Sequence, residues 1–88
     1  MDANFAEGRP VVEYPCPWEY KAIGWDENSM REAIVEIMAD REHDVSFSRA
    51  SGSGRYCSLL LVVVVDSEDH RNAIFRALQE HRHIRMVL

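Results

Sequence analysis

The chain has 88 residues, of which 47% are hydrophobic and 28% are charged, and its formal net charge is −5. These values are typical of one small globular domain, and the acidic balance argues against a nucleic-acid binder that works by neutralising phosphates. The first residues carry neither a basic nor an apolar stretch of the secretory type, and the longest apolar run is far too short to cross a bilayer. We therefore expect a cytoplasmic protein that binds neither nucleic acid nor a membrane.

The polar start of the chain predicts an N-terminal tail over residues 1–10, followed by a single domain over residues 11–88. Side chains then alternate over residues 18–24, which predicts a first strand. The larger apolar side chains of that strand should face the core, and they are Trp18, Tyr20 and Ala22.

A helix is predicted over residues 26–41, because apolar side chains recur there at helical spacing. Two N-caps compete for its first turn. Asp26 is one, and Ser29 is the other, since Glu32 three residues later would complete a capping box.

Two strands joined by a hairpin are predicted next. The first spans residues 45–49, and Ser51–Gly54 supplies the glycines of the turn. The second spans residues 56–65 and contains seven consecutive apolar residues, four of them β-branched, which favours a strand over a helix. Its side chains divide between two faces, with Leu59, Leu61, Val63 and Val65 on one and Leu60, Val62 and Val64 on the other.

A second helix, capped by Asp66 or Ser67 and running to about Glu80, precedes a last short strand over residues 84–88. The order is therefore β-α-β-β-α-β. The right-handed crossover rule turns this order into an α+β ferredoxin-like sandwich, a four-stranded antiparallel sheet with both helices on one face. The first and third strands should be central.

Three segments resemble the YbeD-like family of small bacterial proteins of unknown function. The first is the stretch Val-Val-Glu-Tyr-Pro-Cys-Pro-Trp-Glu-Tyr-Lys-Ala-Ile-Gly over residues 11–24. The others are Ser51-x-x-Gly54-x-Tyr56-x-Ser58 and the ending Arg85-Met-Val-Leu. The resemblance implies a ferredoxin-like fold close to ACT domains, which are small regulatory modules, and it implies no catalytic residues.

ACT modules that bind amino acids tend to carry Asp-x-Pro-Gly after the first strand. Here the matching stretch, residues 24–29, reads Gly-Trp-Asp-Glu-Asn-Ser without Pro-Gly. The resemblance therefore does not extend to the amino-acid effector site.

The sheet face away from the helices is the first candidate binding surface. A chain of this size has few residues left to cover it, and an exposed aliphatic patch usually marks an interface. We expect it to receive a second copy of the chain, another protein or the segment just before the first strand. Its residues are predicted to be Lys21, Ile23, Leu60, Val62 and Val64.

A small molecule or anion is the alternative ligand. It would use the loop after the first strand and the hairpin, where backbone amides and two flanking arginines could hold an anion. These residues are Gly24, Trp25, Asp26, Arg49, Ser51, Gly54 and Arg55. Trp25 could line such a pocket, but packing on the edge of the sheet is the preferred interpretation.

We expect neither an enzyme nor a bound cofactor. No P-loop or Rossmann glycine pattern occurs, and no nucleophile–base set can be placed in one cleft. His81 and His83 would point the same way on a strand and could hold a metal. No thiolate or carboxylate partner is evident beside them, so a polar helix end is the preferred interpretation.

Overall fold

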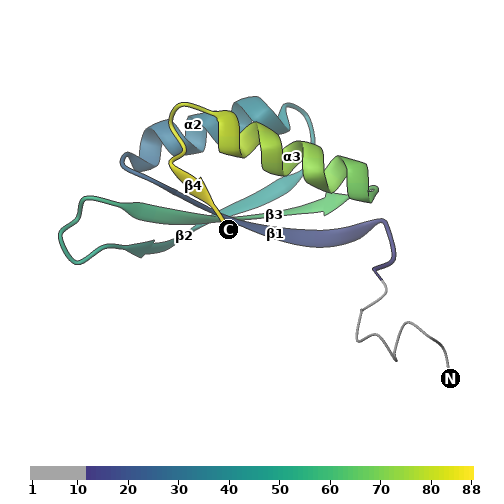
Figure 1. The fold of residues 1–88 in the computed structure, drawn as a ribbon, viewed down its shortest axis with the longest axis horizontal. Coiled ribbons are helices and arrows are strands. Elements are labelled where there is room, and N and C mark those ends of the chain that lie inside the picture. Colours follow the sequence, from purple (N-terminus) through teal and green to yellow (C-terminus); the bar gives the residue numbers. More distant parts are fainter. Residues whose placement is uncertain (1–11) are drawn as a thin grey trace, which may run out of the picture.

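The structure is a computed structural model that describes residues 12–88. The tail predicted at residues 1–10 lies outside this range. In chain order the elements are β1 (Cys16–Gly24), α2 (Glu27–Met38), β2 (His43–Ala50), β3 (Cys57–Val65), α3 (Glu68–Glu80) and β4 (Met86–Val87) (Figure 1).

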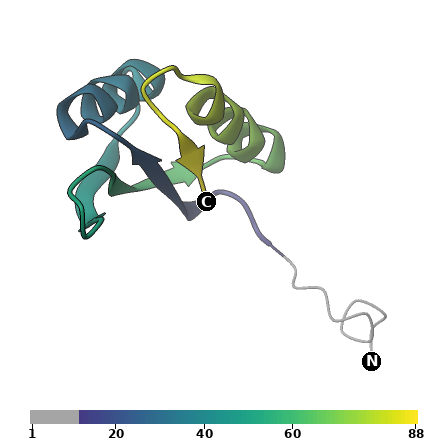
Figure 2. The same ribbon diagram turned by 60° about the vertical axis from the view of Figure 1, so that its left-hand side comes forward.

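The four strands form one antiparallel sheet in the order β2-β3-β1-β4. Figures 1 and 2 show both helices on the same face of this sheet. The ferredoxin-like prediction is therefore confirmed, with β1 and β3 in the centre. The β2–β3 hairpin extends beyond the ends of the helices (Figure 1).

The core lies between the helices and the two central strands. Tyr20 and Ala22 of β1 are 2% and 0% exposed, as the alternation predicted. All four odd-numbered residues of the apolar run are buried as well, whereas Val64 on the other side of the sheet is 47% exposed. Each such side chain contributes about 1.5–3 kcal/mol when fully buried, so this alternation fixes which face receives the helices. The helices contribute Met30, Ala33, Ile34, Met38, Ile74 and Leu78.

Trp18 differs from the other predicted core residues of β1 because it is only half-buried. The guanidinium of Arg71, from α3, lies 4.4 Å from the centre of its ring. Arg71 also donates to the hydroxyl of Tyr14 at 3.0 Å. The indole therefore packs at the margin of the core and is covered by the cation of Arg71.

The observed helix and strand ends depart from the predictions by a few residues. α2 stops at Met38 instead of residue 41, because Ala39 takes a positive φ of 54° and its N–H bonds to the carbonyl of Val35. That role usually falls to glycine, so the sequence contains no signal for it. Of the alternative N-caps, the structure shows Asp26 for α2 and Ser67 for α3.

β4 is shorter than the strand predicted over residues 84–88, but pairing continues past it to the end of the chain. Leu88 donates to the carbonyl of Lys21 at 2.8 Å and accepts from its N–H at 3.2 Å. The chain end is thereby held beside β1.

Candidate functional site

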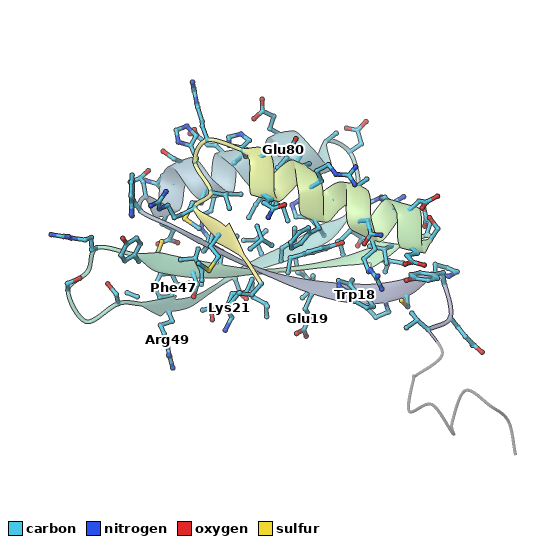
Figure 3. All side chains as sticks on the ribbon, viewed as in Figure 1. Trp18, Glu19, Lys21, Phe47, Arg49 and Glu80 are labelled. Carbon is cyan, nitrogen blue, oxygen red and sulfur yellow. The ribbon has the colours of Figure 1, made fainter. Side chains whose placement is uncertain are left out.

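The sheet face away from the helices, called here the open face, is the larger of two candidate sites. Figure 3 shows Glu19, Lys21 and Arg49 pointing to the side opposite the helices. Strand alternation and register place further side chains on the same side. These are Ile23, Asp44, Ser46, Ser58, Leu60, Val62, Val64, Met86 and Leu88.

All five residues predicted for this surface lie on it. Leu60, Val62 and Ile23 are half-buried by their neighbours in the sheet, and Val64 is exposed. The prediction missed Met86 and Leu88, which are exposed and extend the apolar area across β4. The alternation of the last three residues could have revealed them, once the pairing of β4 with β1 was known.

Residues that lie side by side on neighbouring strands form rows across the open face, and the sign of the charge differs from row to row. In one row, Val62 of β3 lies between Glu19 of β1 and Asp44 of β2. In the next row, Leu60 lies between Lys21 and Ser46. Register places Arg49 beside Ser58 one row further on. The open face is therefore acidic at one end and basic at the other.

The second candidate site is a cleft of about 390 Å³ between the start of α2 and the segment that joins α3 to β4. We call it the Trp25 cleft. The indole of Trp25 is 62% exposed, so of the two sequence-based alternatives the structure has it lining a pocket. The polar and aromatic residues along the cleft are Trp25, Asp26, Ser29, Gln79, His81, Arg82, His83 and Arg85.

Trp25 is in contact with side chains from two other parts of the chain. Its ring centre lies 6.3 Å from that of Tyr56, at the base of the hairpin, and 5.3 Å from the guanidinium carbon of Arg85. Gly24, just before it, has no room for a side chain, because a Cβ there would lie 2.8 Å from the carbonyl oxygen of His83. The loop after β1 and the segment before β4 are thus packed directly on each other.

The hairpin residues predicted for the ligand loop lie elsewhere. Arg49 is on the open face and Arg55 is exposed in the hairpin, and neither lines the Trp25 cleft. The hydroxyl of Ser51 accepts from the N–H groups of Arg55 and Tyr56 at 3.1 and 3.2 Å, while the N–H of Gly54 bonds to the carbonyl of Ser51. These amides are therefore already engaged within the hairpin.

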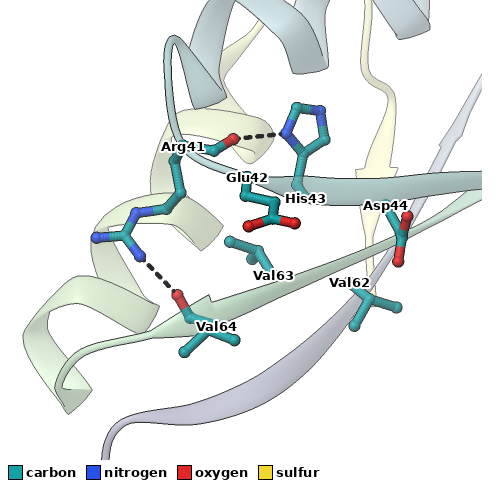
Figure 4. A pocket seen from close by; sticks show the side chains of 7 residues that line it. All are labelled: Arg41, Glu42, His43, Asp44, Val62, Val63 and Val64. Atoms are coloured by element: carbon teal, nitrogen blue, oxygen red, sulfur yellow. Dashed lines mark hydrogen bonds between the residues drawn. The ribbon is translucent and has the colours of Figure 1, made fainter.

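Another pocket, also of about 390 Å³, lies where the chain leaves α2 and enters β2 (Figure 4). Its polar lining consists of Arg41, Glu42, His43 and Asp44. Its guanidinium donates to the carbonyl of Val64 at 2.9 Å and to the carboxylate of Asp66 at 2.7 Å. His43 makes a hydrogen bond with the carbonyl of Arg41 at 2.8 Å. These hydrogen bonds connect the end of β3 to the loop before β2, so the guanidinium of Arg41 stabilises the fold.

Two ionisable groups near the Trp25 cleft have shifted pKa values. Hydrogen bonds from the side chain and backbone N–H of Ser29 lower the pKa of Asp26, which keeps this N-cap carboxylate charged. Burial raises the pKa of the Cys57 thiol, whose sulfur lies 3.7 Å from that of Met30. A thiol held in its protonated form is a poor nucleophile, so Cys57 serves as a packing residue.

The two cysteines are both free and lie at opposite ends of the β1–β3 ladder, where Cys16 faces Val65 and Cys57 faces Gly24. Within residues 12–88, no three His, Cys, Asp or Glu side chains are grouped so that they could hold a metal ion. In the same part of the chain, no helix has the length and apolar character needed to span a membrane.

Known proteins resemble this chain over nearly its whole length. An uncharacterised protein of Campylobacter jejuni is 40% identical over 70 residues, covering 80% of each chain. A UPF0250 protein of Idiomarina loihiensis is 32% identical over 82 residues, covering 89% of this chain and 91% of its own length.

Two solved structures share the fold. The solution structure of protein HP0495 from Helicobacter pylori matches with a TM-score of 0.80 at 22% identity, covering 100% of this chain and 94% of that one. The C-terminal domain of the MgtC protein from Mycobacterium tuberculosis matches with a TM-score of 0.59 at 14% identity, covering 89% of each chain. The family model for a protein of unknown function, DUF493, matches residues 9–88. These matches confirm the YbeD-like resemblance, and the chain belongs to the DUF493 family of small proteins of unknown function.

Proposed function

We propose that this protein is a non-enzymatic interaction module whose open face binds the open face of a second copy. The aliphatic side chains along β3 support this proposal, since they continue through Ile23 into Met86 and Leu88 at the end of the chain. A contiguous apolar surface on an otherwise charged small protein is typical of an interface.

The sorting of charges favours a second copy over an unrelated partner. Consider a twofold axis that lies in the plane of the open face, runs across the strands and passes between the rows of Val62 and Leu60. Rotation about this axis brings Val62 of one protomer over Leu60 of the other, and Glu19 over Lys21. Because the axis is twofold, each contact occurs twice. This pairing of apolar with apolar side chains, and of opposite charges, supports a second copy as the partner.

The size of the open face predicts a weak dimer. The nine-residue central strands are about 30 Å long at 3.3 Å per residue, and four strands span roughly 15–20 Å. The resulting footprint of roughly 500 Å² lies at the low end of specific protein interfaces. We expect a dissociation constant in the micromolar range.

Charge reversal tests the pairing. Glu19→Lys places two lysines opposite each other at both symmetry-related positions, and Lys21→Glu does the same with two glutamates. Each variant should self-associate about tenfold more weakly than the wild type, because exposed attractive pairs become repulsive. Both residues are exposed, so the fold should survive, which thermal melting would verify. Sedimentation velocity over a concentration series measures the association.

Two further samples identify the occupant of the open face. The double variant Glu19→Lys/Lys21→Glu restores opposite charges across the axis and should dimerise like the wild type. An equimolar mixture of the two single variants should also form a dimer, since each supplies the charge that the other lacks. A protein that stays monomeric at several hundred micromolar would overturn the proposal. So would charge-reversal variants that dimerise as well as the wild type.

A further inference from the structure

The segment between α3 and β4 concentrates basic groups in an acidic protein. Four of its five residues, His81 to Arg85, are histidine or arginine, although the net charge of the chain is −5. The exception is Ile84, which is 5% exposed and anchors the segment in the core. The basic side chains around it line the Trp25 cleft.

Backbone contacts hold this segment against β1. The N–H of Arg85 donates to the carbonyl of Ile23 at 2.7 Å, and that of Ile84 to the carbonyl of His81 at 3.0 Å. The carbonyl oxygen of His83 packs closely against Gly24. The Trp25 cleft is therefore preformed, which lowers the ordering cost of binding a ligand there.

Within the described residues 12–88, three arginines have a carboxylate partner, and those of the Trp25 cleft, like Arg49, Arg55 and Arg76, have none. Arg31, Arg41 and Arg71 each lie within 4 Å of an acidic side chain, with distances of 2.9, 2.7 and 3.8 Å. Arg82 and Arg85 form no such pair with any residue of the described range 12–88.

Asp26 and His81, which also line the Trp25 cleft, already have partners. Asp26 accepts from the N–H of Ser29 at 2.9 Å as the N-cap of α2, and His81 bonds to Glu36 at 2.9 Å. An anion entering the cleft would therefore meet two arginines whose charge is not already neutralised by a described carboxylate.

The aromatic side chain of the cleft indicates that the ligand carries a flat ring in addition to its anionic group. Trp25 is 62% exposed and carries the guanidinium of Arg85 at 5.3 Å from its ring centre. A large exposed indole beside a cation offers a stacking surface for a flat ring, and arginine pairs well with carboxylate or phosphate oxygens. A volume of about 390 Å³ accommodates a small molecule that has both parts.

We infer that the Trp25 cleft binds a small anion in which a carboxylate or phosphate is attached to a flat ring. The oxyanion contacts Arg82 and Arg85, and the ring stacks on Trp25. This site is separate from the open face, so binding does not require the dimer.

The indole N–H signals in a ¹⁵N-labelled sample report directly on this site, because Trp25 lines the cleft and Trp18 lies against α3. The probes are adenosine monophosphate, 4-hydroxybenzoate, adenosine and inorganic phosphate. At least one of the first two should shift the Trp25 signal saturably while the Trp18 signal stays in place. Which of them binds distinguishes a phosphate from a carboxylate as the anion. Adenosine and phosphate alone should bind about tenfold more weakly than the compound that joins both parts.

Variants distinguish a specific contribution of the cleft arginines to binding from a general effect of the protein's charge. Arg82→Ala/Arg85→Ala should weaken binding about tenfold or more, whereas Arg55→Ala removes an exposed arginine outside the cleft and should leave it unchanged. Asp26→Asn keeps an N-capping oxygen but removes a negative charge, so it should tighten binding by about threefold. Glu19→Lys should bind like the wild type, whatever its oligomeric state.

Two results would overturn the inference. One is the absence of a saturable Trp25 shift with either ring-bearing anion up to about 10 mM. The other is equal affinity in the double arginine variant and in Arg55→Ala.

Discussion

The carbonyl oxygen of His83 lies only 2.8 Å from the position that a Cβ atom on Gly24 would occupy. That oxygen belongs to the backbone of the segment that leads into β4, so it cannot rotate away as a side chain would. The sulfur of Met30, a fully buried residue of α2, lies equally close to that position. Gly24 is thus the point where β1, α2 and the C-terminal segment meet.

Gly24→Ala should therefore destabilise the protein. The added methyl group forces the segment around His83 or the side chain of Met30 to shift, and overpacking of this kind costs about 1–3 kcal/mol of the free energy of unfolding. Urea denaturation followed by circular dichroism measures the loss. Gly52→Ala is the matched control, because nothing lies within 4 Å of its Cβ position. Equal midpoints for the two variants would contradict the prediction.

The sequence predicted the fold well because alternation is a strong local signal. The apolar run in β3 has a side-chain period of two, and a slip of one residue would have exposed Leu59 and Leu61 to water. The element order and the crossover rule then left one arrangement for the sheet. The end of α2 escaped prediction because Ala39, not a glycine, takes the positive φ there.

The candidate site was harder to predict because it depends on contacts between distant segments. The sequence indicates the loop after β1, but it offers the hairpin, and not residues 81–85, as the partner of that loop. Arg49 and Arg55 do flank a glycine-containing turn, yet that turn uses its own amides. The close approach of His83 to Gly24 has no local signature, since a glycine at the end of a strand is also expected simply to terminate it.

Arg41→Ala should lower the free energy of unfolding by about 1 kcal/mol. The substitution removes the hydrogen bond to the carbonyl of Val64 and the partly exposed ion pair with Asp66. Because the ion pair is screened by salt, the loss should be smaller in 1 M than in 0.05 M sodium chloride. Arg76→Ala, at an exposed position of α3, is the control for removing a positive charge. If both variants unfold at the same urea concentration in low salt, Arg41 does not tie β3 to the loop as described.

Tyr20 provides a hydrogen bond between the core of β1 and α3, in which its hydroxyl donates to the carbonyl of Arg71 at 2.7 Å. Burial raises the pKa of this phenol to about 12. In the unfolded chain the same group ionises near pH 10. Between these values the unfolded chain loses a proton that the folded protein keeps, so the free energy of unfolding falls as the pH rises.

Tyr20→Phe should therefore lower the free energy of unfolding by an amount that depends on pH. At pH 7 the variant should be less stable than the wild type by about 1 kcal/mol, because the hydrogen bond to Arg71 is lost. Above pH 10 this difference should shrink, since the wild type loses stability through ionisation of Tyr20 and the variant has no hydroxyl to ionise there. Urea midpoints of both proteins from pH 7 to pH 11 test the prediction, and the contribution of other titrating groups cancels in the difference. A gap that stays constant across this range would show that Tyr20 ionises alike in the folded and unfolded chains.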